Sequence, residues 1–198
     1  SLTTVRLGYS NANEALNKEL FKHLFELYDN RNPTLGELTL LTKNFVLTDI
    51  NNTRKFTLLG DPALALNYPR YNIVTTEVNN KPISSAVDTF KALSQITVSG
   101  QIQDDNGNVM TGFNGVIYPV VYDKVSTLQT LGNDAGSPIR AFKLYRNILF
   151  RGKASVTNGT FNFTFIVPKD IDYQYGFGRI SYYADNGSNL DAHGFTQT

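Results

Sequence analysis

The sequence predicts an α/β segment at residues 1–69 and an all-β sandwich at residues 70–198. Two observations predict this division. Apolar residues recur at helical spacing in the first part, whereas from Tyr71 onward they alternate with polar residues, as in half-buried strands. Asn-Gly pairs, which favour the tight turns of β-hairpins, occur at four places in the second part. The short linker around Pro69 joins the two parts.

The composition excludes several classes of function. The chain has 198 residues, a net charge of +1 and 18% charged residues, so it offers no basic stripe to nucleic acid and no polybasic tail to a membrane. No apolar run approaches the about 20 residues that span a bilayer. Residues 1–9 lack the charged leader and apolar centre of a signal peptide. With no cysteine, the chain has no disulfide, thiolate metal ligand or cysteine nucleophile of its own.

Two helices are expected in residues 1–69. An Asn11 cap with Glu14 three residues later predicts the start of the first helix. Its apolar face is expected to comprise Leu16, Leu20, Leu24 and Leu27, flanked by Phe21, Phe25 and Tyr28. Thr34 and Glu37 form a capping box that opens the second helix, whose apolar positions are Leu38, Leu41 and Phe45.

Two strands complete this segment. Residues 4–8 are expected to form a short strand, and the apolar run Phe56–Leu59 is typical of a parallel strand that is buried on both faces. Strand, helix, helix, strand is the repeating unit of an α/β sheet. Because two strands make only a marginal sheet in water, we expect residues 1–69 to be the end of a larger α/β domain.

The second part reads as a β-sandwich with short turns. The expected inward-facing positions are Ile96, Val98, Gly100 and Ile102, then Phe161, Phe163, Phe165 and Val167, then Ile180, Tyr182 and Ala184. Asn-Gly turns are expected at 106–107, 114–115, 158–159 and 186–187. Residues 130–139 are expected to form a surface loop between strands.

Gly60-Asp61-Pro62 is the first candidate site. It follows the expected strand at its carboxyl end, where α/β proteins often bind ligands, so Asp61 could be a base or a metal ligand. A turn in which Asp61 bonds to local amides and Pro62 stops the strand is the favoured interpretation. His23 is expected to be a partly exposed helical residue. His193 has only Asp191 nearby, and one histidine with one carboxylate does not complete a zinc site.

Three further patterns each have a structural and a functional interpretation. Residues 104–108, Asp-Asp-Asn-Gly-Asn, resemble a calcium loop but lack its spacing and its terminal Glu, so a hairpin turn is favoured. Glycosylation acceptor triplets occur at Asn51, Asn158, Asn162 and Asn186. An aromatic cluster could stack on carbohydrate, although a role in the core is favoured; it comprises Tyr173, Tyr175, Phe177, Tyr182 and Tyr183.

Several phrases of the chain resemble a known family. "LNKELFKHLFE", "PTLGELTLLTKNF" and "FTLLGDPALALNYPRY" resemble the closing segment of the caspase-like domain of gingipain-family cysteine peptidases. "ALSQITVSGQIQDDNGNVMTGFNGVIYPVVYDK", "ILFRGKASVTNGTFNFTFIVPKDI" and "YGFGRISYYADNG" resemble the immunoglobulin-like β domain of the gingipain-like sortase of the type IX secretion system. The resemblance spans nearly the whole chain.

The resemblance implies a scaffold rather than a catalytic centre. The family's nucleophile is a cysteine with a histidine partner, and both are expected before residue 1, so no catalytic, metal or cofactor residue is assigned to this chain. The implied partners are the upstream part of the same peptidase domain, exported cargo proteins and other secretion-system subunits. The implied location is the outer membrane, on the cell surface of a bacterium. The alternative is a self-contained β-sandwich module for binding or adhesion.

Overall fold

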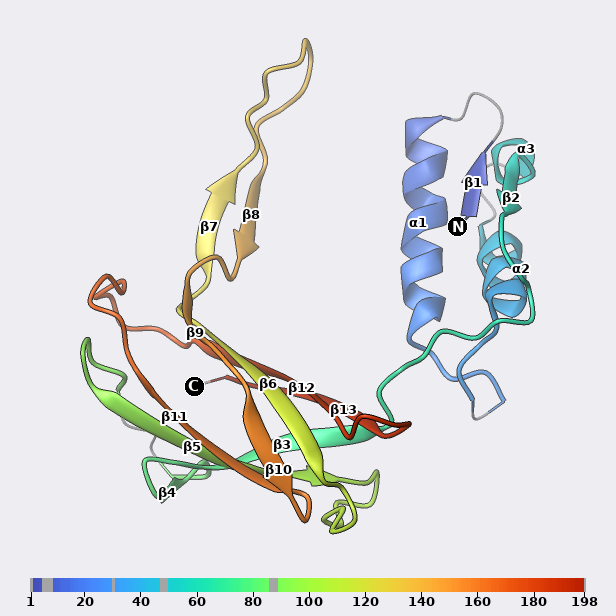
Figure 1. The fold of residues 1–198 in the computed structure, drawn as a ribbon. Coiled ribbons are helices and arrows are strands. Elements are labelled where there is room, and N and C mark those ends of the chain that lie inside the picture. Colours follow the sequence, from blue (N-terminus) through green and yellow to red (C-terminus); the bar gives the residue numbers. More distant parts are fainter. Residues whose placement is uncertain (1, 5–8, 30, 47–49, 86–88, 198) are drawn as a thin grey trace. The chain divides into compact units, whose positions relative to one another are not determined.

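The chain folds into two compact units, Ser1–Tyr68 and Pro69–Thr198. The structure is a computed structural model (Figure 1) that describes residues 2–4, 9–29, 31–46, 50–85 and 89–197. The first unit contains the helices and the second is built from strands.

The first unit pairs two short strands beside two main helices. In chain order its elements are β1 (Leu2–Thr4), α1 (Ser10–Leu24), α2 (Leu35–Phe45), α3 (Ile50–Thr53) and β2 (Phe56–Leu58). Strands β1 and β2 pair antiparallel, with Leu2 opposite Leu58 and Thr4 opposite Phe56. Helices α1 and α2 pack together, and the rings of His23 and Phe45 lie 5.0 Å apart at their contact.

The predicted capping box is confirmed. The Glu37 N–H donates to Thr34 Oγ1 at 3.2 Å, and the Thr34 N–H donates to Glu37 Oε2 at 2.9 Å. Arg31 also donates to both carboxylate oxygens of Glu37. These bonds lower the pKa of Glu37 to about 2, and the bond from Arg31 has the largest effect.

The predicted start of α1 is wrong. Asn11 is not its cap, because the helix begins at Ser10 after Tyr9, whose side chain makes no capping bond. The acceptor comes instead from α3: Asn52 Oδ1 accepts from the Tyr9 N–H at 3.1 Å, and Asn52 Nδ2 donates to Asn13 Oδ1 at 3.0 Å. Asn52 is fully buried. A residue about 40 positions away therefore fixes the helix start, and no local pattern indicates it.

The predicted parallel strand is also wrong. Among the described residues, β2 has one partner, the antiparallel strand β1, and its side chains are half-buried or exposed. Leu59, the last residue of the apolar run, is 58% exposed. The run is apolar as in a buried strand, but the described residues of this unit leave it partly exposed. Of the first predicted strand, Thr4 ends β1, and residues 5–8 lie outside the described residues.

The second unit is formed by strands that belong mainly to one sheet. The strands of that sheet are β3 (Tyr71–Val78), β4 (Lys81–Pro82), β5 (Gln95–Gln103), β6 (Gly115–Tyr122), β9 (Ile148–Arg151), β10 (Ala154–Thr157), β11 (Thr160–Ile166), β12 (Arg179–Asp185) and β13 (Asp191–Gln197). A separate hairpin joins β7 (Ser126–Gln129) to β8 (Ala141–Leu144) and extends away from the sheet (Figure 1). The predicted surface loop at 130–139 lies at its tip, as expected.

The main sheet closes on itself instead of forming two separate sheets. Its strand order is β10-β11-β5-β3-β13-β12-β6-β9, with β4 on β3, and β10 also pairs with β6. Neighbours are antiparallel except β13 and β3. Strand β10 makes the closure because Val156 lies opposite both Phe161 of β11 and Gly115 of β6. The prediction of a mostly β unit is confirmed, and its hydrogen bonding runs continuously around the core.

The core lies inside this closed sheet, as the alternation predicts. Buried apolar side chains at the predicted positions are Ile96, Val98, Ile102, Phe161, Phe163, Phe165, Val167, Ile180, Tyr182 and Ala184. Phe150 stacks on Phe163 and Phe165, with ring centroids 5.8 and 5.1 Å away. A buried hydroxyl network completes the core: Thr75 Oγ1 lies 2.7 Å from the Tyr182 hydroxyl and 2.8 Å from Thr196 Oγ1. Burial raises the pKa of Tyr182, which keeps its hydroxyl protonated.

The Asn-Gly turns are confirmed at three of four positions. Asn158 and Gly159 form the two-residue turn between β10 and β11 with φ of 49° and 72°, as a primed turn requires. Gly187 (φ 74°) and Gly107 (φ 82°) also lie in turns with positive φ. The fourth prediction is wrong, because Gly115 is the first residue of β6. A Cβ at Gly115 would lie 2.1 Å from the Asp185 carbonyl oxygen, so glycine here permits close strand packing.

Candidate functional site

Gly60-Asp61-Pro62 forms a turn that closes onto the start of α2. Gly60 has a φ of 148°, and Asp61 Oδ1 accepts from the Ala63 N–H at 2.9 Å. The Pro62 carbonyl accepts from the Gly36 N–H at 2.9 Å, so the turn satisfies one of the free donors at the helix N-terminus. Asp61 is exposed and bonds to a local amide, as in the favoured interpretation.

The two histidines lie in different units. The prediction that His23 is partly exposed is wrong, because its side chain is 6% exposed and packs on Phe45 of α2. Its Nδ1 lies 2.8 Å from Glu26 Oε2, and its Nε2 lies 3.5 Å from Glu19 Oε2. His193 is exposed on β13, opposite Tyr183. Within the described ranges, no group of three or more His, Cys, Asp or Glu residues could hold a metal ion.

The acidic loop after β5 is a self-satisfied turn. Asp104 Oδ1 accepts from the N–H groups of Asn106 and Asn108, both at 2.9 Å. The Asn108 side-chain amide donates to Asp104 Oδ2 at 3.1 Å and is the main cause that lowers the pKa of Asp104. Local donors thus occupy both oxygens of this carboxylate. The loop therefore forms the turn that the sequence favoured. An isolated β-bridge between Gln103 and Val109 closes it.

The acceptor triplets lie at the surface. Asn51, Asn158 and Asn162 are exposed. Asn186 is half-buried, and its Oδ1 accepts from the N–H groups of Ser188 and Leu190, both at 3.0 Å. Its side-chain oxygen therefore stabilises the turn before β13.

The aromatic cluster does not stay together in the core. Tyr182 is buried, but Tyr173, Tyr175 and Phe177 are 74%, 92% and 76% exposed, so the core interpretation is wrong for these three. They lie in the segment between β11 and β12, where no strand pairing aligns alternate side chains with the core. Tyr183 is on β12 but points outward, and its ring stacks on Tyr118.

A buried carboxylate holds this aromatic segment. Asp123 Oδ2 accepts from the Asp172 N–H at 3.0 Å, and Asp123 Oδ1 accepts from the Lys124 N–H at 2.7 Å. Lys124 Nζ donates to the Asp172 carbonyl. Burial alone would raise the pKa of Asp123, but the bonds from Asp172 and Lys124 lower it overall. The aromatic side chains are therefore carried by an anchored segment.

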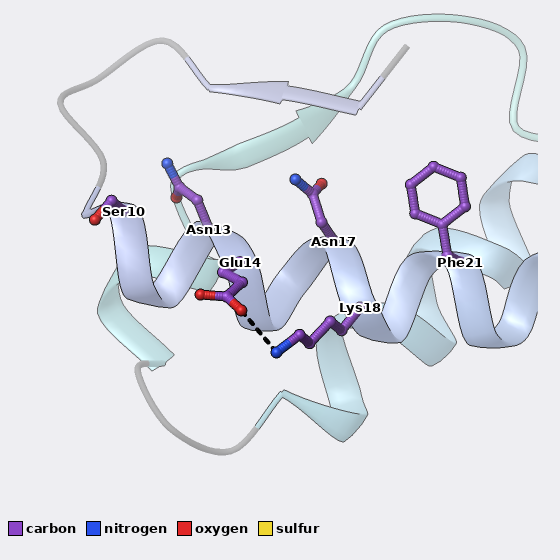
Figure 2. Close-up of a pocket in the computed structure, with 6 residues that line it drawn as sticks. All are labelled: Ser10, Asn13, Glu14, Asn17, Lys18 and Phe21. Atoms are coloured by element: carbon purple, nitrogen blue, oxygen red, sulfur yellow. Dashed lines mark ion pairs between the residues drawn. The ribbon is translucent and has the colours of Figure 1, made fainter. Parts of the chain in front are cut away.

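A shallow hollow of about 620 Å³ lies along α1 (Figure 2). Its lining residues are Ser10, Asn13, Glu14, Asn17, Lys18 and Phe21. Lys18 Nζ lies 2.7 Å from Glu14 Oε1, and the ring of Phe21, 62% exposed, projects from the helix on the side of Asn13 and Asn17 (Figure 2). The lining holds no pairing of a nucleophile with a base, so the hollow has no evident chemistry of its own.

Many large apolar side chains of the first unit lie exposed on its surface. The buried aliphatic side chains of its described part, apart from Pro33, are Leu16, Leu38 and Val46. Large apolar side chains that remain more than half exposed are Tyr9, Phe21, Phe25, Leu27, Leu40, Phe45, Leu59 and Leu64. Monomeric proteins seldom leave so many large apolar residues of one small unit in water, so this surface is a candidate interface. No helix of the described chain is long and apolar enough to cross a membrane.

Comparison with known proteins identifies related chains. Residues 1–67 match the model of peptidase family C25. The crystal structure of dimeric latent PorU from Porphyromonas gingivalis matches with a TM-score of 0.56 and 30% identity, over 87% of this chain and 17% of that chain. Spo0M, a sporulation control protein from Bacillus subtilis, matches with a TM-score of 0.34 and 12% identity, over 66% of this chain and 49% of that chain.

The C25 and PorU matches agree with the resemblance seen in the sequence. The Spo0M match carries no argument at this level of similarity, and a search among curated proteins finds no match. The chain spans about a sixth of the length of the PorU chain. The C25 match ends at residue 67, at the last residues of the first compact unit. Residues 1–67 are thus similar to peptidase family C25, the gingipain family, and the chain as a whole is similar to PorU.

Proposed function

We propose that this chain is the non-catalytic C-terminal portion of a gingipain-like cysteine peptidase with sortase activity. In this proposal, residues 1–69 complete the caspase-like peptidase domain, and residues 70–198 form the immunoglobulin-like domain that follows it. The parent enzyme would form a thioester through a cysteine that this chain does not carry. Its substrates would be the C-terminal signals of type IX secretion cargo at the bacterial outer surface.

The observation that carries the proposal is the unsatisfied surface of the first unit. A two-stranded antiparallel sheet and two helices leave Phe21, Phe25 and Leu27 62%, 72% and 67% exposed. Burying a large apolar side chain contributes about 1.5–3 kcal/mol, so docking several of them onto the rest of a peptidase domain would be strongly favourable. The match to family C25 over residues 1–67 supports the upstream part of that domain as the partner.

In this proposal the chain has a structural role in the enzyme and supplies no catalytic residue. The proposal assigns no catalytic role to either histidine: His23 is buried against Phe45, and His193 lies in the other unit. The turn at Asp61 is bonded to α2 and ends the α/β segment. Cargo proteins and other secretion subunits would be partners of the whole enzyme. The enzyme would be located on the outer side of the cell surface.

The test compares the 198-residue chain alone with the chain joined to its upstream peptidase sequence. The isolated chain is expected to bind an apolar fluorescent dye and to self-associate, and the joined protein to do neither. Replacing Phe21 and Phe25 by Ser should reduce dye binding of the isolated chain. Replacing Tyr173 and Tyr175 of the second unit by Ser is the matched control. In this variant, joining the upstream sequence should still abolish dye binding and self-association.

A self-contained binding module predicts the opposite result. In that case the isolated chain would be monomeric and bind no dye, and the upstream sequence would change nothing. That outcome would overturn the proposed scaffold role and favour adhesion as the function of the β unit.

A further inference from the structure

One outer face of the second unit carries an ordered array of aromatic side chains. Inward positions of β6, β12 and β13 fill the core, so the alternate positions point outward. The strand registers place these outward residues in three rows across the strands: Tyr118, Tyr183 and His193; Val120, Ser181 and Phe195; and Tyr122, Arg179 and Gln197. We call this array the outer aromatic face.

The rings of this face are held by one another. Tyr118 and Tyr183 stack with centroids 6.2 Å apart and an interplanar angle of 26°. The Tyr145 ring, from the segment after β8, lies 6.1 Å from Tyr122. Phe195 is 61% exposed, while Tyr183 and Tyr118 are 44% and 41% exposed. Aromatic side chains that are already ordered lose little conformational entropy when a partner covers them.

Arg179 is a charged group without an acceptor on this face. Its guanidinium carbon lies 4.3 Å from the centre of the Phe195 ring and 5.8 Å from that of Tyr145. Its Nε is buried without a hydrogen-bond partner among the described residues. Arg31 in the first unit shows the contrast, because Glu37 accepts from both of its terminal nitrogens. A partly buried guanidinium without a carboxylate is unfavourable, so an acceptor from outside is expected.

The charges around the face specify the partner. Arg151 of β9 lies opposite Val120 and extends the middle row with a second exposed cation. The acidic residues Asp185 and Asp191 lie beyond the Tyr183 row, at the far end from Arg179. Arg179 and Arg151 thus place two cations beside rings on this face, away from its acidic end. A planar carboxylate fits the donor edge of an arginine, and Tyr, Phe and Arg are the residue types that dominate protein interfaces.

We propose that the outer aromatic face binds an acidic segment of a partner polypeptide, with a carboxylate on Arg179 and apolar atoms against Phe195 and Tyr145. A neutral saccharide, which could also stack on the rings, offers no charge to Arg179. This inference concerns the second unit alone and stands whether or not the first unit completes a peptidase domain.

The test measures binding of a fluorescein-labelled peptide, acetyl-Glu-Phe-Glu-Phe-Glu-amide, to the 198-residue chain by fluorescence anisotropy at low ionic strength. The counterpart peptide has Gln in place of each Glu. The acidic peptide is expected to bind about tenfold more tightly, because a hydrogen-bonded charge pair with Arg179 is lost in the counterpart. Arg179→Gln should abolish this difference, and Phe195→Ala should weaken both peptides.

Controls separate the site from general charge. Arg140→Gln removes an exposed cation in the hairpin loop after β7 and should leave both affinities unchanged. Thermal unfolding confirms that each variant is folded. The proposal is overturned if the two peptides bind equally, if neither binds at millimolar concentration, or if Arg179→Gln keeps the preference. Tighter binding of inorganic phosphate or of a neutral oligosaccharide such as maltohexaose than of the acidic peptide would overturn it as well.

Discussion

Removing the Tyr182 hydroxyl tests how the buried polar network stabilises the second unit. The Tyr182 side chain is 4% exposed, and its hydroxyl lies 2.7 Å from Thr75 Oγ1, which in turn lies 2.8 Å from Thr196 Oγ1. Tyr182→Phe keeps the ring and removes one buried hydrogen bond. The free energy of unfolding should fall by about 1 kcal/mol, because Thr75 keeps Thr196 as a partner.

The double-mutant cycle with Thr75→Val gives the sharper result. Thr75→Val alone should cost about 1–2 kcal/mol, since it takes a partner from both remaining hydroxyls. The double variant should cost less than the two single changes together, by a coupling free energy of about 1 kcal/mol. Urea unfolding of the four proteins, followed by circular dichroism, measures each value.

Two outcomes would refute this reasoning. Additivity of the two changes within about 0.3 kcal/mol would show that the hydroxyls do not interact. Tyr183→Phe is the matched control, because Tyr183 is the adjacent residue and points outward, 44% exposed. Tyr183→Phe should change the free energy of unfolding by less than about 0.5 kcal/mol. A loss equal to that of Tyr182→Phe would show that the buried network contributes no more than an exposed hydroxyl.

The remaining predictions concern the first unit. Gly36→Ala should destabilise this unit by about 1–3 kcal/mol, because the new Cβ would lie 2.9 Å from the Pro62 carbonyl oxygen. Urea unfolding measures the change. An unchanged midpoint would mean that the turn does not pack on α2 in solution. The folded-state pKa of Glu37 is lowered from 4.5 to about 2, so its ion pair with Arg31 stabilises the fold fully above pH 4.5 and is lost as the pH falls toward 2. Glu37→Gln should therefore flatten the dependence of the unfolding midpoint on pH in this window, and an unaltered slope would contradict the assignment.

Local sequence rules predicted much of the fold. The Thr34 capping box, the alternation through Phe161 to Phe165 and the Asn158-Gly159 turn each depend on residues a few positions apart. Such features need no tertiary partner to be recognised. The predicted family likewise rests on continuous phrases of sequence, and the match of residues 1–67 to family C25 agrees with it.

The errors share a different cause, which is that distant residues decide the outcome. Asn52 of α3 fixes the start of α1, although Asn11 looked like its cap. His23 is buried because Phe45 of another helix covers it. The closure of the sheet by β10 depends on a second pairing with β6, which periodicity along one strand cannot indicate.

The outer aromatic face was missed for a related reason. Tyr118, Arg179 and Phe195 lie far apart in the sequence and come together only through the registers of β6, β12 and β13. The available signal was that several outward positions of these strands carry aromatic rings, namely Tyr118, Tyr122, Tyr183 and Phe195. Strand order was needed to show that these rings share one face.

The central claim is that the first unit leaves apolar side chains uncovered until the rest of a peptidase domain packs on them. Hydroxyl-radical footprinting of Phe21, Phe25 and Phe45, read by mass spectrometry, tests it most directly because it reports the exposure of each side chain. Joining the chain to its upstream sequence should sharply reduce the oxidation of these rings, while Tyr175 in the second unit, 92% exposed, should react as before. Equal oxidation of the three rings in the isolated and joined proteins would contradict the claim.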